Sequence, residues 1–201
     1  MKSKHKIQSI CIYCASSEAI DRSYFEAADQ LARTIFEEGM EIVCGGGKVG
    51  LMGQLADTAK EVGGTITGIL PTFMIEIEKQ HPGLTRMIEV ETMSERKLAF
   101  LDHADALVML PGGTGTFEEF FEAVTLKRLG KITHPIVLLN TGGYYDPLLA
   151  LMHRAVEERF MDDRHVGLYS AVDQPEEVLP ALFDAPLWKE EYAKYAAVTK
   201  K

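Results

Sequence analysis

A single glutamate, Glu119, follows a glycine-rich turn at a spacing that permits chemistry on a phosphorylated compound. Residues 106–110 form a short apolar run, as expected of a strand buried on both faces of a parallel sheet. Pro111 cannot donate to a strand ladder and ends the run. The turn after it contains three glycines, which let the backbone approach a ligand closely: Gly112, Gly113 and Gly115. Helical spacing begins at Thr116, so unpaired N–H groups at a helix N-terminus would face an anion, with Glu119 one turn inside the helix.

A second glycine-rich turn follows the predicted strand at residues 41–44 and leads into a helix that ends near residue 62. It contributes Gly45, Gly46, Gly47, Gly50, Met52 and Gly53. Its Gly-x-Gly-x-x-Gly spacing matches the dinucleotide fingerprint, which also expects an acidic residue roughly 20 positions later. This chain has Leu70 and Pro71 there. We therefore interpret the turn as a second phosphate loop rather than a nicotinamide site, and we group Ser16, in the turn after the first strand, with it.

Two cations, Arg96 and Lys97, stand in the first turn of a helix that we expect Ser94 to cap. A helix dipole favours acidic residues at this end, so the cations suggest a bound anion nearby. The alternative is a solvated helix end.

Two phosphate loops, an arginine and a carboxylate suit hydrolysis at the sugar carbon of a nucleotide. Cleavage of an N-glycosidic bond builds positive charge on the ribose ring, which a carboxylate can stabilise. Arg96 would then fix the phosphate or polarise the departing base. The alternative for Glu119 is an ordinary surface acid near a favourable helix end. Neither turn carries the Gly-Lys-Ser/Thr of a P-loop, and the chain has no Gly-x-Ser-x-Gly elbow.

Length and composition predict one globular domain over residues 1–201, with 46% hydrophobic and 25% charged residues. The net charge of −9 argues against general affinity for nucleic acid or acidic membranes. No apolar run reaches the roughly 18 residues of a membrane span, and the start does not read as a signal peptide, so we expect a cytoplasmic protein. Cys11 and Cys14 have C-x-x-C spacing but fall in a predicted strand. They should point to opposite faces, so we interpret them, with Cys44, as buried structural thiols and expect no metal.

Strands and helices alternate along the chain, which predicts an α/β fold with a parallel sheet covered by helices on both faces. The predicted strands are residues 7–14, 41–44, 65–70, 87–91, 106–110, 135–139 and 168–172. Ser23 and Asp146 are expected to cap two of the helices. Residues 71–84 read as a loop or short helix near a site, and the segment from Pro186 reads as a terminal helix or frayed tail. Ligands should bind at the carboxyl ends of the strands.

Two glycine signatures, Pro111-Gly-Gly-x-Gly-Thr-x-x-Glu119 and Gly45-Gly-Gly-x-x-Gly-Leu-Met-Gly53, resemble those of the LOG ("Lonely Guy") family. Its members are cytokinin riboside 5′-monophosphate phosphoribohydrolases, once widely mislabelled lysine decarboxylases. The resemblance implies a homodimeric modified Rossmann fold. It also implies cleavage of a nucleoside 5′-monophosphate, AMP or an N6-prenylated AMP, to free base and ribose 5-phosphate, with no cofactor.

The resemblance assigns catalysis to Arg96 and Glu119. The implied nucleotide contacts are Glu78, Lys97, Gly112, Gly113, Thr114, Gly115, Thr116, Phe117, Glu118 and Thr125. Thr114 and Phe117 depart from the residues that the family often has, and the first departure could alter the fit to the base. The predicted partners are a small nucleotide and a second copy of the chain, with no nucleic acid or membrane. Two rivals remain: a non-catalytic nucleotide or cofactor carrier on the same fold, and lysine decarboxylation, for which the sequence shows no pyridoxal-binding motif.

Overall fold

Seven parallel strands form one sheet in the computed structural model, which describes residues 6–197. The order across the sheet is β4-β3-β2-β1-β5-β6-β7. The strands are β1 (Ser9–Tyr13), β2 (Glu41–Cys44), β3 (Ile66–Pro71), β4 (Arg86–Val90), β5 (Ala106–Met109), β6 (Ile136–Leu139) and β7 (Ser170–Val172). The predicted α/β class and parallel sheet are confirmed.

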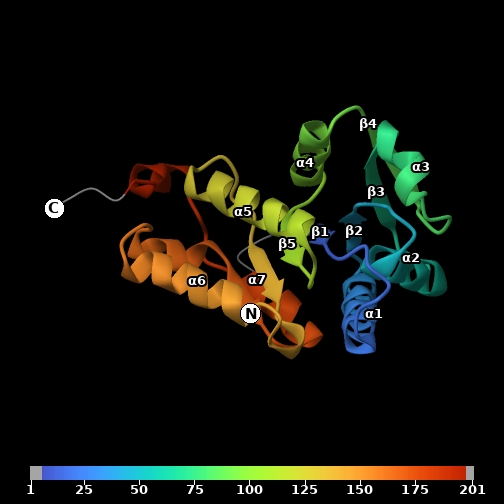
Figure 1. The fold of residues 1–201 in the computed structure, drawn as a ribbon, viewed down its shortest axis with the longest axis horizontal. Coiled ribbons are helices and arrows are strands. Elements are labelled where there is room, and N and C mark those ends of the chain that lie inside the picture. Colours follow the sequence, from blue (N-terminus) through green and yellow to red (C-terminus); the bar gives the residue numbers. More distant parts are fainter. Residues whose placement is uncertain (1–5, 198–201) are drawn as a thin grey trace.

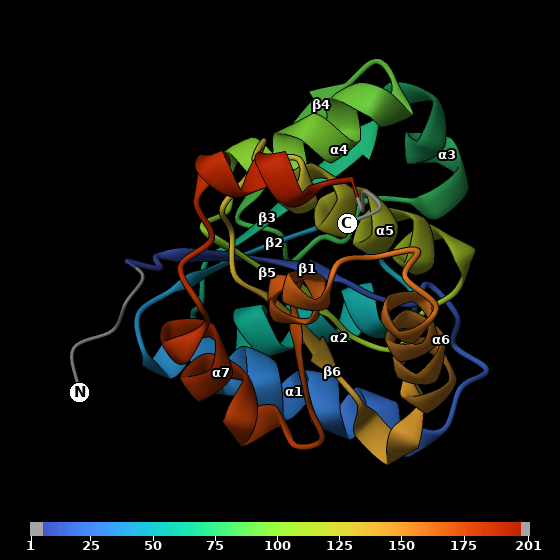
Figure 2. The same cartoon turned by 90° about the vertical axis from the view of Figure 1, so that its left-hand side faces the viewer.

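Helices cover both faces of this sheet (Figures 1 and 2). The α-helices are α1 (Arg22–Glu37), α2 (Gly50–Val62), α3 (Ile75–Glu78), α4 (Met93–Asp102), α5 (Thr114–Arg128), α6 (Asp146–Glu157) and α7 (Val178–Asp184). Short 3₁₀ helices are Thr72–Met74, Thr141–Gly143, Asp163–Leu168, Pro175–Glu177 and Glu190–Tyr195. One core packs α1, α2 and α7 on the sheet, and the other packs α4, α5 and α6 on the opposite face.

The strand order reverses direction at β1. From β1 the chain builds outward through β2, β3 and β4, and then returns to place β5 on the other side of β1. In such sheets the loops at the reversal part to opposite faces and leave a crevice at the carboxyl ends of the two strands. The crevice here lies between the end of β1 and the glycine turn after β5.

Several helix starts differ from those that the sequence predicts. Asp21, not Ser23, caps α1, and its carboxylate accepts the Ser23 N–H at 2.9 Å. Thr92, not Ser94, caps α4 through a 3.1 Å bond from the Glu95 N–H. In both cases a neighbouring residue with an equally good cap oxygen is used, since Ser, Thr and Asp compete for this role.

Two further starts shift in the same way. α5 begins at Thr114 rather than Thr116, and Asp146 is the first residue of α6 rather than its cap. The prediction of a loop or short helix over residues 71–84 is confirmed by the 3₁₀ helix Thr72–Met74 and by α3. The terminal segment contains a 3₁₀ helix, and its final residues lie outside the described part.

The cysteines lie as predicted with one exception. Cys11 packs into the core on one face, and Cys14 packs against the core on the other. Cys11 and Cys44 are buried, whereas Cys14 is partly exposed at the crevice. Burial raises the pKa of the Cys14 thiol well above its ordinary value. In the described part of the chain, none of the helices has the length and apolar character needed to cross a bilayer.

Candidate active site

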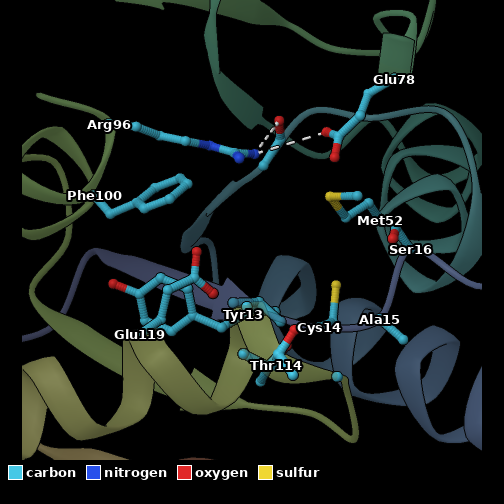
Figure 3. Close-up of a pocket in the computed structure, with 15 residues that line it drawn as sticks. Tyr13, Cys14, Ala15, Ser16, Met52, Glu78, Arg96, Phe100, Thr114 and Glu119 are labelled. Atoms are coloured by element: carbon cyan, nitrogen blue, oxygen red, sulfur yellow. Dashed lines mark hydrogen bonds and ion pairs between the residues drawn. The ribbon is translucent and has the colours of Figure 1, made fainter. Parts of the chain in front are cut away.

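A cavity of about 230 Å³ occupies the crevice at the reversal of the sheet (Figure 3). Ten of the residues that the sequence nominates line it: Ser16, Gly45, Met52, Glu78, Arg96, Gly113, Thr114, Gly115, Thr116 and Glu119. They come from the ends of β1 and β2, from α2, from the short helix α3, and from α4 and α5. Segments far apart in the sequence therefore meet where the fold predicts a ligand site.

The remaining nominated residues do not line this cavity. They are Gly46, Gly47, Gly50 and Gly53 of the second glycine turn, and Lys97, Gly112, Phe117, Glu118 and Thr125. Lys97 on α4 pairs with two acids of α5, with its Nζ 2.5 Å from Glu118 and 3.3 Å from Glu122. The exposed Thr125 lies further along α5. Substrate contacts by these residues stay predictions.

The glycines of the second turn mainly allow close packing of the backbone, and the turn does not form an open phosphate loop. A Cβ on Gly46, where φ is +75°, would come within 2.9 Å of the Gly68 Cα. A Cβ on Gly50, where φ is +64°, would come within 2.5 Å of the backbone carbon of Ser16. The Leu51 N–H at the start of α2 already donates to the Ala15 carbonyl at 2.9 Å. Close approach and positive φ therefore account for these glycines without a ligand.

The N-terminus of α5, by contrast, is open toward the cavity. Among the described residues, no protein acceptor receives a hydrogen bond from the backbone N–H groups of residues 113–116. A Cβ on Gly113 or Gly115 would meet no atom within 4 Å. Unpaired donors at the positive end of a fifteen-residue helix, beside empty space, make a ready anion site.

Arg96 forms the opposite wall and is 6% exposed. Its Nε donates to the Ile69 carbonyl at 2.9 Å, and one terminal nitrogen donates to the Gly45 carbonyl at 3.1 Å. Its guanidinium carbon also lies 5.3 Å from the centroid of the Phe100 ring. These contacts fix a positive charge at the cavity while leaving guanidinium donors for a ligand. A Cβ on Gly45 would come within 2.5 Å of the guanidinium and 2.7 Å of the Met52 sulfur, so a side chain at this position would displace Arg96 from these contacts.

Glu78 reaches the cavity from α3 (Figure 3). One of its carboxylate oxygens lies 3.9 Å from Arg96, is buried, and has no hydrogen-bond partner in the described structure. A buried carboxylate oxygen normally accepts hydrogen bonds. The partner that the described structure gives it is the Arg96 guanidinium at 3.9 Å, so Glu78 balances part of that buried charge.

Glu119 enters the cavity from α5, about one and a half turns into the helix. Burial raises the pKa of its carboxyl from 4.5 to about 7, the positive charge of Arg96 lowers it, and the neighbouring Glu118 adds to the rise. A carboxyl with a pKa near the working pH can exchange a proton in either direction. Perturbed carboxyls in a cleft are a mark of functional sites.

Sequence reasoning missed five residues that line the cavity: Ile12, Tyr13, Cys14, Ala15 and Phe100. The first four follow one another at the end of β1. The rule that ligands bind beyond the carboxyl ends of strands at a reversal of strand order would have identified them. Phe100 follows Arg96 by one helical turn, so its side chain lies on the same face of α4.

Comparison with known proteins identifies the family of this chain. A family model described as "Possible lysine decarboxylase" matches residues 52–182. A cytokinin riboside 5′-monophosphate phosphoribohydrolase of Arabidopsis thaliana is 39% identical over 160 residues, which cover 80% of this chain and 75% of that protein. The chain belongs to the LOG family. A phosphoribohydrolase of the same name from Rhodococcoides fascians is 39% identical over 155 residues, covering 77% of this chain and 78% of the relative.

Solved structures share the fold of this LOG-family chain. A molybdenum cofactor binding protein from Rippkaea orientalis has a TM-score of 0.66 at 22% identity, covering 87% of this chain and 94% of that one. A molybdenum cofactor carrier protein from Chlamydomonas reinhardtii has a TM-score of 0.65 at 21% identity, covering 88% and 96%. At these identities the likeness concerns the fold alone.

The open N-terminus of α5 gives a first prediction. Gly115→Ala adds a methyl group into empty space, so the protein should fold and gain up to about 1 kcal/mol from helix propensity. The same methyl group would occupy the anion site. The kcat/KM for nucleotide hydrolysis should therefore fall at least about tenfold, because KM rises. Gly167→Ala, on a 3₁₀ helix with equally open space, is the control and should leave turnover unchanged. A Gly115→Ala enzyme with parental KM would contradict an anion site at α5.

The raised pKa of Glu119 gives a second prediction. The folded state binds this proton more tightly than the unfolded chain, so the carboxyl destabilises the fold as pH rises from about 4.5 to about 7. Glu119→Gln should remove that penalty. Urea unfolding should show it about 1–3 kcal/mol more stable than the parent at pH 8, with the gain gone below pH 4.5. Glu122→Gln, a control on the same helix, should show no such gain in the free energy of unfolding. If Glu119→Gln and the parent were equally stable at pH 8, the burial of an ionised Glu119 carboxyl would be contradicted.

Proposed function

We propose that this chain hydrolyses the N-glycosidic bond of a nucleoside 5′-monophosphate, releasing the free base and ribose 5-phosphate. The observation that carries the proposal is that Arg96 and Glu119 line one cavity with the open N-terminus of α5. The family relatives that bear the name phosphoribohydrolase support it. AMP and N6-prenylated AMP are the proposed substrates.

The geometry favours one orientation of the nucleotide. The 5′-phosphate would bind the N–H groups at Gly113 to Thr116, because these are the unpaired donors at a positive helix end. The ribose would then lie between α5 and α3, where Glu78 lines the cavity. The sugar carbon would then lie on the side of the cavity that Glu119 lines.

The reaction breaks the bond between the anomeric carbon and the base nitrogen, and a water oxygen forms the new bond to that carbon. Positive charge builds on the ribose ring in the transition state. Ionised Glu119 stabilises this charge and takes a proton from the water. That proton then passes, directly or through solvent, to the nitrogen of the departing base, which returns Glu119 to its ionised form. Arg96, on the wall opposite the phosphate (Figure 3), would stabilise negative charge on the leaving base.

The rival functions are less well supported by the cavity. A cofactor carrier needs binding residues, but it does not need a carboxyl whose pKa lies near 7. Lysine decarboxylation needs a lysine that forms a Schiff base with pyridoxal phosphate. None of the described residues lining the cavity is a lysine.

We also propose that the protein acts as a symmetric homodimer that covers the mouth of the cavity. Large apolar side chains are exposed on the elements that supply the site: Phe73, Ile77, Met93, Leu98 and Phe121, with exposures of 38–75%. The predicted surface of α5 is only partly available, because Phe120 and Val124 are buried in their own core. Exposed apolar patches of this kind mark interaction surfaces. A second copy would also bring side chains near Lys97 and Thr125.

The phosphate requirement tests the proposed function. Contacts to a group remote from the broken bond can be used to orient the sugar, so losing them reduces turnover as well as affinity. Adenine release from AMP, followed by chromatography, should exceed that from adenosine by at least about a thousandfold in kcat/KM, or ~4 kcal/mol. Comparable rates for the two compounds would contradict the phosphate site. No adenine release from AMP or prenylated AMP would contradict the function itself.

Sedimentation equilibrium tests the assembly. The parent should sediment near twice the chain mass of 22.3 kDa at micromolar concentration. Leu98→Glu, which places a charge on the proposed interface where the side chain is 59% exposed, should yield monomers. Phe160→Glu, at a similarly exposed residue beyond α6, is the matched control and should remain a dimer. A parent that sediments as a monomer would overturn the proposal.

A further inference from the structure

Two consecutive tyrosines that follow β6 hold the backbone on either side of Pro111. The hydroxyl of Tyr145 donates to the Leu110 carbonyl at 2.7 Å, and the hydroxyl of Tyr144 donates to the Gly112 carbonyl at 2.5 Å. Both acceptors belong to the turn that leads into α5. The segment after β6 therefore supports the glycine turn from outside the cavity, since neither tyrosine lines it.

The tyrosine pair is itself fixed by Asn140 at the end of β6. The Asn140 side-chain oxygen accepts the Tyr145 N–H at 2.7 Å, while its nitrogen donates to Asp146 at 2.9 Å and to Asp173 at 3.1 Å. A fully used side-chain amide of this kind positions the chain around it. The turn that carries the two phenols is therefore anchored to the sheet.

Packing then orients the ring of Tyr144. It stacks on Phe117 of α5 with ring centroids 6.5 Å apart, and it meets the Tyr24 ring edge-on at 6.1 Å. Burial raises the pKa of the Tyr144 phenol above its ordinary value, so the hydroxyl keeps its proton and remains a donor. The bond to Gly112 thus comes from a ring that contacts two other aromatic rings, with 37% of the residue's surface exposed.

The bond to the Gly112 carbonyl also bears on the direction of the Gly113 N–H, because both groups belong to the same peptide. In a planar trans peptide the C=O of Gly112 and the N–H of Gly113 point in opposite directions. Gly113 lines the cavity, and its N–H has no acceptor among the described residues. Because glycines flank this peptide on both sides, backbone sterics alone would let it rotate.

We propose that Tyr144 is a positioning residue that, by holding the Gly112 carbonyl, keeps the Gly113 N–H directed at the phosphate of the substrate. The inference rests on the proposed function for the identity of the anion. Tyr144 does not touch the substrate in this account. It acts through one peptide group, and its loss should be felt as weaker phosphate recognition rather than as loss of fold.

Tyr144→Phe removes the hydroxyl and keeps the ring packing. Ribose 5-phosphate binding, measured by calorimetry, should weaken about tenfold, the effect of losing roughly one hydrogen bond. The kcat/KM for AMP should fall by a similar factor, mainly through KM, while the slow cleavage of adenosine should not change. Tyr24→Phe removes a phenol hydroxyl from the same aromatic cluster, one that has no hydrogen bond in the described structure, and should leave all three quantities unchanged.

The outcomes separate the two levels of the proposal. Suppose that the parent binds ribose 5-phosphate and prefers AMP to adenosine. If Tyr144→Phe then shows the parental Kd for ribose 5-phosphate and the parental kcat/KM for AMP, the positioning role is overturned. An equal fall in kcat/KM for AMP and for adenosine would also overturn the positioning role, since that pattern indicates general damage to the site. If the parent itself fails to bind ribose 5-phosphate or to distinguish AMP from adenosine, the phosphate site of the proposed function fails first.

Discussion

The fixed position of one buried charge, the guanidinium of Arg96, constrains the rest of the site. A cation taken out of water must find hydrogen-bond acceptors or it destabilises the fold by several kcal/mol. The acceptors here are the carbonyls of Ile69 and Gly45, near the end of β3 and just after β2. The sheet thus determines where the charge lies, and the crowding around it determines that residue 45 has no side chain.

The two sides of the cavity present different charged and polar groups to a ligand. One side offers the N–H groups of α5 to an anion, and across from them lie Arg96 and the Glu78 carboxylate that pairs with it. Glu119 sits between these sources of charge. Its burial raises the energy of the ionised form, and Arg96 offsets part of that cost. A ring that develops positive charge beside Glu119 would offset more of it, so the arrangement favours the transition state over the ground state.

The sequence predicted the sheet because strands depend on local patterns, and the glycine signatures led to Arg96 and Glu119, which line one cavity. Apolar runs and glycine turns located every strand to within a few residues, and the spacing of Pro111 to Glu119 located α5. The sequence could not distinguish a glycine required by packing from one that leaves room for a ligand. Gly46 and Gly115 look alike in the chain, and only tertiary contacts separate them. The support of the turn by Tyr144 was missed for the same reason, since the partners are 32 residues apart.

The proposed reaction depends most on Glu119, the carboxylate that would stabilise positive charge on the ribose. The direct measurement is the rate of adenine release from saturating AMP at pH 8 by Glu119→Gln, beside Glu122→Gln from the next turn of the same helix. Glu119→Gln keeps the shape and removes the charge, so the rate should fall by roughly 10²–10⁴, while Glu122→Gln should stay within about threefold of the parent. A Glu119→Gln enzyme with a rate within about threefold of the parent would contradict the account.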